Sequence, residues 1–513
     1  MKNTSSPLSA SSVRWSAATL GLLGVALGFN YVRDANARPT PPSGPDCVLP
    51  VQQTPTVAVV HPNGNASAGG ISLDAALSQA QLQRGADGEL YLHCGVTVRE
   101  DAGAEAPRRP LNLALVLDTS GSMQNSMGLL REATLGAVDR LGPNDRLTIV
   151  AYSSSARLVY SGFPAQTGRA AMAELVNGLQ AGGNTNLSAG IELAAQQLVS
   201  SSGSPGCRIP LERGCREPVE DCEAPQRAPQ AAFVQRMLVL TDGLANLGVT
   251  DPAGLRTMIT RVRSKGSAVS SLGLGAEFNE ELLGGLADSG GGAYHYVSEP
   301  AALDAVYAAE VEAMQGLVAK RAELVIRAQD GTVLDEVFSW PSEQNPDART
   351  VAIGDLSRGR SLKVMARIHV GTAGPQAALD TLQVSLRYTD PDSGALRTLD
   401  PIALSVGVTD SADEARASVD AALTADLAKV RVARQLDQAR AAAKAGRYEE
   451  AQQLARDCKE IVGTDSMSYD APAGAPCEVD FDELADGLAE GESSERGRRA
   501  LKQSHAAELG ASR

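Results

Sequence analysis

An apolar run that ends in a polar turn is the strongest constraint on this fold. Residues 111–123 read LNLALVLDTSGSM. A strand without charged side chains is typical of a parallel sheet that helices cover on both faces. The turn after it offers Asp118, Ser120 and Ser122, residue types that also cap helices and form turns for purely local reasons. A metal site at this turn would need further oxygen ligands from elsewhere in the chain.

Strand-like and helix-like segments alternate from about residue 111 to residue 313. Further strands are expected at 146–152, 156–162, 236–242, 267–275 and 292–298, and helices at 129–141, 171–179 and 187–198. This alternation predicts an α/β fold with a doubly wound, mainly parallel sheet. The segment 156–162 follows the strand before it so closely that it is expected to be an antiparallel edge strand.

Two further segments place oxygen atoms at the same edge of the predicted sheet. GGNTNLSAGI, residues 182–191, carries Thr185 on a glycine-rich loop that leads into a helix, and LVLTDG, residues 238–243, ends a strand with Asp242. Open α/β sheets bind their ligands at the carboxyl ends of the strands. Carboxylate and hydroxyl ligands suit a hard divalent cation such as Mg²⁺, and no His or Cys is present to favour zinc.

These three segments resemble the metal-ion-dependent adhesion site of the von Willebrand factor type A family. Asp118, Ser120 and Ser122 match its D-x-S-x-S motif. Thr185 matches the loop threonine of the family, and Asp242 matches the aspartate of its T-D-G motif. The resemblance implies that the three hydroxyl side chains contact the ion directly, while the two carboxylates act mostly through water.

The resemblance covers about residues 108–313 and implies a binding function. Three neutral hydroxyls leave the charge of the ion poorly neutralised, so an Asp or Glu carboxylate of a partner protein is expected to complete its coordination. Mg²⁺ is the expected ion, with Mn²⁺ or Ca²⁺ as alternatives. The chain is expected not to be an enzyme, because no nucleophile elbow, phosphate loop or zinc-protease motif is present. The alternative hypothesis is an envelope assembly scaffold that binds through other regions and uses the metal only for structure.

The N-terminus indicates export. Basic residues precede the apolar stretch WSAATLGLLGVALGF, and a small-x-small site follows at 35–37, the order found in secretory signals. Residues 1–37 are therefore expected to be a cleaved signal peptide or, alternatively, an anchor spanning the membrane with 15–32. A proline-rich spacer is expected at 38–54. The protein would be periplasmic, secreted or on the cell surface, and the net charge of −15 argues against nucleic-acid binding.

Seven cysteines fit an exported protein, in which disulfides persist. Pairing of Cys47 with Cys94 and of Cys458 with Cys477 is expected. Cys207, Cys215 and Cys222 lie in the Cys-rich segment 200–232, which reads as a surface insertion stapled by a disulfide. Their spacing lacks a C-x-x-C pair and no histidine is near, so zinc binding is disfavoured.

The regions flanking the α/β domain, 108–320, differ in character. Alternating segments at 321–408 predict an antiparallel β-sandwich, to which strands within 55–107 are expected to contribute. The stretch 323–338, ELVIRAQDGTVLDEVF, is expected to form a hairpin with an Asp-Gly turn. The Ala-rich segment 412–465 predicts a helical hairpin. Residues 478–513 are acidic and rich in Gly and Ser, so a disordered tail is expected there.

Overall fold

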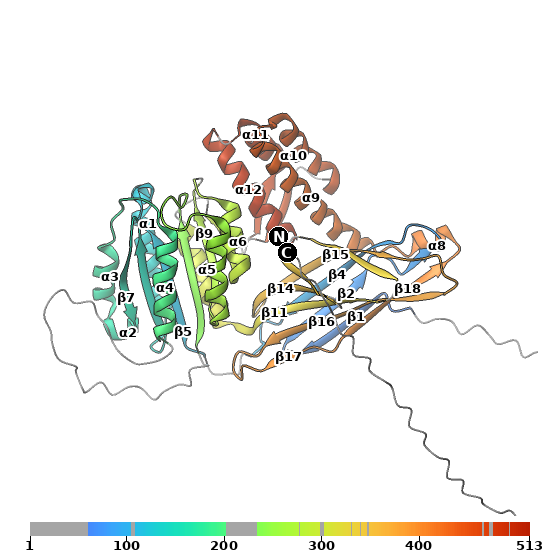
Figure 1. Cartoon of the computed structure of the whole chain (residues 1–513), viewed down its shortest axis with the longest axis horizontal. Coiled ribbons are helices and arrows are strands. Elements are labelled where there is room, and N and C mark those ends of the chain that lie inside the picture. Colours follow the sequence, from blue (N-terminus) through green and yellow to red (C-terminus); the bar gives the residue numbers. More distant parts are fainter. Residues whose placement is uncertain are drawn as a thin grey trace, which may run out of the picture. The chain divides into compact units, whose positions relative to one another are not determined.

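The computed structural model describes residues 60–103, 108–201, 233–275, 277–297, 302–329, 331–338, 340–345, 348–463, 466–470, 476–491 and 493–512. The expected signal segment and spacer lie outside these residues, as does most of the Cys-rich insertion. Figure 1 shows three parts: an α/β domain, a β-sandwich and a C-terminal helical region.

A six-stranded sheet forms the centre of the α/β domain, in the order β10-β9-β8-β5-β6-β7. Its strands are β5 (Leu111–Asp118), β6 (Arg146–Tyr152), β7 (Ala156–Gly162), β8 (Val234–Thr241), β9 (Ala268–Leu274) and β10 (Gly291–Val297). Neighbouring strands run parallel except β7, which pairs antiparallel with β6 at the edge. The predicted α/β fold with a mainly parallel sheet is therefore confirmed.

Helices cover both faces of this sheet, and the sequence of β5 shows why. Alternate side chains of β5 enter two separate apolar cores: Leu113 and Leu115 join one core, and Ala114 and Val116 join the other. The first core is closed by α1 (Met127–Asp139), α3 (Arg169–Asn177) and α7 (Leu303–Gln315), and the second by α4 (Leu187–Ser201), α5 (Pro252–Ser264) and α6 (Glu280–Gly290). Two short helices complete the domain, η1 (Gly121–Asn125) and α2 (Pro164–Thr167). A strand buried on both faces needs the continuous apolar run seen here.

The parallel strands place two kinds of loop at opposite edges of the sheet. Asp118 and Asp242 follow the carboxyl ends of β5 and β8. The chain enters β8 at the other edge, because Val234 pairs with Leu111 at the start of β5. The residues that bound the insertion, Ser201 and Phe233, end α4 and precede β8. The chain therefore re-enters from the insertion at the edge of the sheet opposite to the predicted ligands.

Strands from both sides of the α/β domain build the sandwich. One sheet has the order β1 (Asn63–Ala68), β2 (Ile71–Leu77), β4 (Glu89–Val98), β15 (Ser361–Val370) and β12 (Thr332–Val337). The other has the order β13 (Ser342–Asn345), β14 (Ala348–Ser357), β11 (Leu317–Ala328), β16 (Ala378–Thr389), β18 (Ile402–Thr409) and β3 (Gln81–Gln83), with β17 (Leu396–Thr398) beside β16. A shared core fills the space between the sheets. The α/β domain is thus inserted between strands of one sandwich.

The predicted hairpin at 323–338 is wrong. β11 and β12 flank the Asp-Gly pair as expected, but β11 pairs with β14 and β16, whereas β12 pairs with β15 in the other sheet. β14 and β16 occupy both edges of β11, and each of them is longer than β12. The chain therefore crosses to the opposite sheet after the turn. Local turn chemistry favours a hairpin only where the strand edge stays free.

The C-terminal region contains more structure than the sequence indicates. It comprises α8 (Ala412–Ala417), α9 (Ala421–Lys444), α10 (Tyr448–Val462), β19 (Ser466–Asp470), β20 (Pro476–Asp480), α11 (Phe481–Glu490) and α12 (Glu495–Ser512). The predicted disordered tail at 478–513 is therefore wrong. Phe481, Leu484 and Leu488 recur at helical spacing and are buried in a core with α9 and α10. The acidic residues of the segment occupy the outer face of a packed helix.

The two expected disulfides that involve described cysteines are also absent. Cys94 and Cys458 are free thiols, and both are buried. Cys94 lies on β4 and faces the sandwich core, and Cys458 lies on α10 and faces the helical core. Each thiol is surrounded by apolar side chains and behaves as a small hydrophobic residue. Cys47, Cys207, Cys215 and Cys222 lie outside the described residues.

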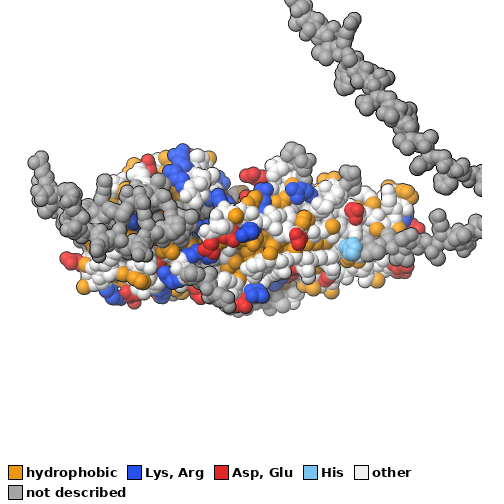
Figure 2. All heavy atoms as spheres, turned by 90° about the horizontal axis from the view of Figure 1, so that it is seen from below, with side chains coloured by type: hydrophobic (Ala, Val, Ile, Leu, Met, Phe, Trp, Pro, Cys, Tyr) orange, Lys and Arg blue, Asp and Glu red, His pale blue; other side chains and the backbone are white. Residues whose placement is uncertain are grey.

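The surface shows no segregation of charge on the face drawn in Figure 2. Lys and Arg side chains alternate with Asp and Glu side chains there, with hydrophobic side chains between them. Among the described residues, no helix is long and apolar enough to cross a membrane. The apolar stretch at 15–32 lies outside those residues.

Candidate metal centre

Asp118 ends β5 with a fully buried carboxylate that three strand ends hold in place. Its Oδ1 accepts a hydrogen bond from the backbone N–H of Ser120 at 2.8 Å. Its Oδ2 accepts from Thr241 Oγ1 at 2.7 Å and from the hydroxyl of Tyr152 at 3.2 Å. Thr241 ends β8 and Tyr152 ends β6, so parallel strands that finish at one edge fix the orientation of this carboxylate.

Ser120, Ser122 and Asp242 continue the array of oxygen atoms toward solvent. The Oγ atoms of the two serines lie 3.1 Å apart, and Ser122 Oγ donates to Asp242 Oδ1 at 2.6 Å. Ser120 is buried, Ser122 is exposed and Asp242 is half-buried. The turn after β5 therefore meets the turn after β8 through side-chain oxygens at an accessible position.

Thr185 reaches the same place from a third segment. A Cβ atom added to Gly243 would lie 3.5 Å from Ser122 Oγ and 4.0 Å from Thr185 Oγ1, so both hydroxyls flank one backbone position. The backbone of Thr185 is held on both sides: its N–H donates to Asn246 Oδ1 at 2.9 Å, and its carbonyl accepts from the N–H groups of Asn246 and Leu247. The five residues expected from the sequence are thus brought together.

The glycine-rich loop before Thr185 is joined directly to the turn after β5. Gly121 N–H donates to the carbonyl of Gly183 at 3.1 Å, and Gly182 N–H donates to the carbonyl of Thr119 at 2.9 Å. Gly183 has a φ of +83°, and a Cβ atom there would lie 2.7 Å from Ser154 Oγ. Only glycine meets both conditions without strain, which explains the residue type beside the threonine.

Burial dominates the electrostatics of the two carboxylates. Burial raises the pKa of Asp118, against the hydrogen bonds from Thr241 and Ser120. Burial also raises the pKa of Asp242 to about 6, opposed by the hydrogen bond from Ser122 and aided by the negative charge of Asp118. The largest contributions to the two shifts come from burial, from neighbouring hydrogen bonds and, for Asp242, from other carboxylates, not from a Lys, Arg or His. Two neighbouring carboxylates of this kind are neutralised by a bound cation or by a proton.

The donor set fits a hard divalent cation. The converging side chains offer only carboxylate and hydroxyl oxygens, the ligands that Mg²⁺, Mn²⁺ and Ca²⁺ prefer. In the described parts of the chain, no three His, Cys, Asp or Glu side chains gather in a way that could hold a metal ion. Ligation at this edge of the sheet would therefore depend on the hydroxyls of Ser120, Ser122 and Thr185.

Two residues that support the site were not predicted from the sequence. Thr241 and Tyr152 both donate to Asp118, and each is the last residue of its strand. A polar residue at the end of a strand beside β5 is the signal that points to them, but only the strand order shows which strands lie next to β5. Asn246, four residues after Asp242, also supports the site, because its side chain accepts from the backbone N–H of Thr185.

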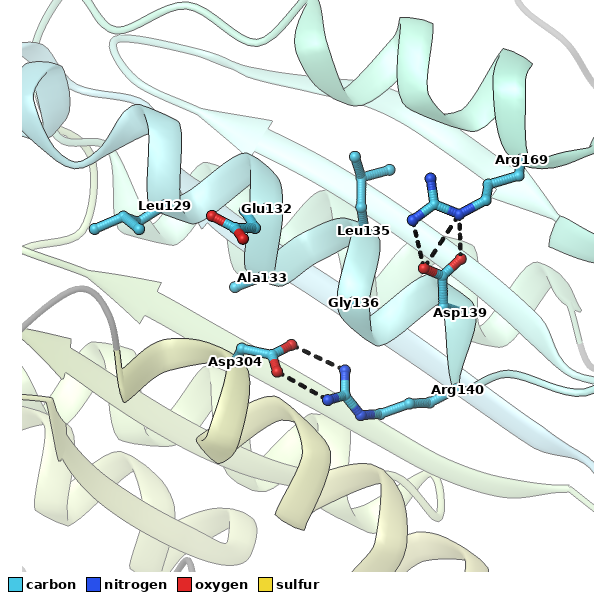
Figure 3. Close-up of a pocket in the computed structure, with 9 residues that line it drawn as sticks. All are labelled: Leu129, Glu132, Ala133, Leu135, Gly136, Asp139, Arg140, Arg169 and Asp304. Carbon is cyan, nitrogen blue, oxygen red and sulfur yellow. Dashed lines mark hydrogen bonds and ion pairs between the residues drawn. The ribbon is translucent and has the colours of Figure 1, made fainter.

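A groove on the α/β domain lies away from these residues. It has a volume of about 730 Å³ and lies over α1, toward α3 and α7 (Figure 3). Arg169 pairs with Asp139, and Arg140 pairs with Asp304 at 2.8 Å, so four of the five charged groups that line it form ion pairs with one another. None of the five candidate ligands lines this groove.

Comparison with known proteins agrees with this description. Residues 112–309 match the von Willebrand factor type A domain family. The chain is 26% identical over 352 residues to the uncharacterized protein sll0103 of Synechocystis sp., covering 66% of this chain and 76% of that protein. It is also 26% identical over 284 residues to the uncharacterized protein YfbK of Escherichia coli, covering 53% of this chain and 44% of that protein. The chain thus spans less than half of the second relative.

A solved structure extends the likeness of fold beyond the α/β domain. The von Willebrand factor type A protein from Catenulispora acidiphila has a TM-score of 0.58 at 17% identity, covering 84% of this chain and 96% of that chain. At this identity the likeness concerns the fold alone. Together, the sequence match, the order of the sheet and this shared fold show that residues 112–309 are a von Willebrand factor type A domain.

Proposed function

We propose that this domain binds a partner protein through a divalent cation held by Asp118, Ser120, Ser122, Thr185 and Asp242. Domains of this family are generally interaction or adhesion modules rather than enzymes. One observation carries the proposal: three hydroxyls and two carboxylates from three separate segments converge at one accessible edge. Mg²⁺ is the ion we expect, and Mn²⁺ and Ca²⁺ are the alternatives.

The residues divide into two roles. Asp118 has both oxygens occupied by protein donors, so it orients the turn and contributes negative charge. Ser120, Ser122 and Thr185 supply neutral oxygen donors at the accessible side. A bound Mg²⁺ would supply a positive charge with an open coordination position.

The proposed partner offers an Asp or Glu carboxylate. Neutral hydroxyls around the ion leave much of its charge uncompensated, so an external anionic oxygen is favoured over water. The edge that carries the site is open to such a group, because Ser122 is exposed and Asp242 is half-buried. The remaining affinity and the specificity would come from the loops around the ion.

We further propose that the protein is exported and acts in the periplasm, at the cell surface or after secretion. The support is the order of basic residues, apolar stretch and small-x-small site in residues 1–37. The membrane would be contacted only if residues 15–32 remain as an anchor.

Metal titration tests the site. We expect Mg²⁺ and Mn²⁺ to bind the protein in isothermal calorimetry, and Ser122→Ala and Thr185→Ala to weaken binding at least about tenfold, as each removes one ligand oxygen. Ser361→Ala is the matched control, because Ser361 is exposed on β15 in the sandwich. Equal metal affinity in all four proteins would contradict the assignment.

Partner capture tests the function. The protein is used as bait in extracts of its own cell envelope and culture fluid, with Mg²⁺ or with a chelator. We expect partners that are retained in Mg²⁺, released by chelator and not retained by Ser122→Ala. Partners retained equally in every condition would show that recognition takes place outside the candidate metal site.

A further inference from the structure

Three bulky apolar side chains are exposed directly after Asp242. Leu244 is 57% exposed, Leu247 38% and Val249 37%, all on the loop between β8 and α5. Nine large hydrophobic side chains are exposed among the described residues, and three of them fall within these six positions. Single exposed apolar residues are ordinary, but a cluster of them marks an interaction surface.

The loop is fixed against the segment that carries Thr185. The backbone N–H of Leu247 donates to the Thr185 carbonyl at 3.3 Å, and the N–H of Val249 donates to Ser188 Oγ at 2.9 Å. Gly248, with a φ of +75°, approaches so closely that an added Cβ atom would lie 2.3 Å from Asn186 Oδ1. The exposed side chains therefore have a fixed place beside the candidate ligands.

The same loop separates inward from outward side chains. Ala245 packs against the core formed with α4 and α5, whereas Leu244 on its N-terminal side is turned to solvent. Leu244 is two residues from the carboxylate of Asp242. The three exposed apolar side chains thus follow the candidate ligand Asp242 directly along the chain. They border the candidate metal site.

We propose that the carboxylate recognised at the metal is flanked, in the partner, by aliphatic or aromatic side chains that pack on Leu244, Leu247 and Val249. This inference rests on the proposed function and specifies which acidic segments of a partner the domain would select. An ion and a carboxylate attract more strongly where apolar side chains exclude water and lower the local dielectric. Burial of these side chains also adds a favourable contribution that the carboxylate contact alone lacks.

A peptide selection tests the inference without knowledge of the natural partner. The immobilised protein selects from a display library of short random peptides in Mg²⁺, and bound peptides are eluted with chelator. We expect the eluted peptides to carry an Asp or Glu with Leu, Ile, Val, Phe or Tyr within two positions. The selection is repeated with the Leu244→Ser, Leu247→Ser protein and with the control Leu396→Ser, an exposed leucine of the sandwich.

Affinity measurements then distinguish the contribution of the exposed leucines from that of the ion. For a selected peptide, we expect the double variant to lose roughly tenfold in affinity, since two partly exposed leucines are removed from the contact. Its Mg²⁺ affinity is expected to stay within about twofold of the unchanged protein, because no ligand oxygen is altered. Leu396→Ser is expected to match the unchanged protein in both measurements.

The outcomes distinguish the two proposals. Acidic peptides without an apolar neighbour, or apolar neighbours selected equally by the double variant, would overturn the inference and leave metal-dependent binding intact. If Mg²⁺ binds and no acidic peptide is eluted by chelator, both proposals are wrong. Loss of Mg²⁺ binding in the double variant would show that the loop supports the metal site rather than the partner.

Discussion

Asp118 has a structural role besides the role proposed for it at the metal, and substitution can separate the two. Its carboxylate accepts from Ser120, Thr241 and Tyr152 while it is fully buried. Removing a buried acceptor leaves its donors without partners, which costs more than the loss of one exposed hydrogen bond.

We predict that Asp118→Ala lowers the free energy of unfolding by about 1–3 kcal/mol, because the N–H of Ser120 loses its acceptor and the hydroxyls of Thr241 and Tyr152 keep only their backbone acceptors. Ser122→Ala, at an exposed position, is expected to change it by less than about 0.5 kcal/mol. Urea denaturation of both variants without added metal measures the difference. Equal stabilities would show that the carboxylate matters only when an ion is bound.

Arg236 and Glu310 form a second buried charged cluster, which the metal site does not use. Arg236 Nη1 lies 2.6 Å from Glu310 Oε2, and His295 Nε2 lies 2.6 Å from Glu310 Oε1. Burial opposes the charge of Glu310, but the charge of Arg236 outweighs it and holds the pKa of this carboxyl well below its usual range. Arg236 also approaches Asp355 of β14 at 3.6 Å. The cluster therefore joins β8, β10, α7 and the sandwich.

We predict that Glu310→Ala destabilises the protein by about 3–5 kcal/mol, because it leaves the buried Arg236 without its main partner. The double variant Arg236→Met, Glu310→Leu is expected to recover part of that loss, since the buried guanidinium and carboxylate are removed together while Asp355 loses only its 3.6 Å contact. Thermal and urea unfolding compare the two. A double variant as unstable as the single one would mean that the ion pair itself, not the stranded charge, provides the stability.

At the scale of elements, α12 and α9 contact the N-terminus of α6 through one carboxylate. Lys502 Nζ on α12 lies 3.1 Å from Glu280 Oε2 and donates to the carbonyl of Phe278 at 2.7 Å. Lys444 Nζ at the end of α9 lies 2.8 Å from Glu280 Oε1. Burial acts to raise the pKa of Glu280, but the two lysines outweigh it and lower this pKa from 4.5 to about 2.

The lowered pKa of Glu280 predicts a loss of stability in acid. A carboxyl whose pKa falls on folding stabilises the folded state fully above its unfolded value of 4.5, and this contribution disappears as the pH falls toward about 2. Its size is on the order of 3 kcal/mol. We therefore expect the stability difference between the protein and Glu280→Gln to be largest near neutral pH and to shrink below pH 4.5.

Glu281→Gln is the matched control for this measurement. Glu281 also contacts Lys444, at 2.7 Å, but its side chain is 62% exposed. Water screens exposed ion pairs, so this substitution is expected to change stability little at any pH. A difference for Glu280→Gln that does not depend on pH would show that the contact is not ionic.

At the scale of the whole molecule, the α/β domain interrupts a sandwich whose strands come from both sides of it. β4 pairs with β15 over nine residue pairs, from Ser361 opposite Thr97 to His369 opposite Glu89. The apolar cores of the sandwich and of the α/β domain are distinct. The helical region has a core of its own. None of the five candidate ligands lies in that region.

We predict that deletion of residues 412–512 leaves Mg²⁺ affinity within about twofold, because every candidate ligand and its supporting donors precede the deletion. The melting temperature is expected to fall, since Glu280 loses both lysines. Calorimetry, thermal unfolding and partner capture are compared with the full chain. Lost partner binding with unchanged Mg²⁺ affinity would favour the scaffold hypothesis over recognition at the metal.

The sequence by itself determined what depends on local order. The apolar run before Asp118 requires a strand covered on both faces, and the alternation of strands and helices requires a parallel sheet whose loops meet at one edge. With these two features and the resemblance of three segments to the family's motif, the five candidate ligands could be named, and the structure brings them together. The predicted roles of these residues toward an ion are what the metal titration will test.

Tertiary structure decided everything that depends on competition between distant segments. β11 does not pair with β12, because β14 and β16 occupy both of its edges. Residues 481–512 fold into α11 and α12, because α9 and α10 supply an apolar surface that a composition count does not reveal. Tyr152 supports Asp118, and Leu244 stays exposed, only because of which elements lie beside them. Periodicity fixes which face of a segment is apolar, but the partner that covers that face is chosen by the whole chain.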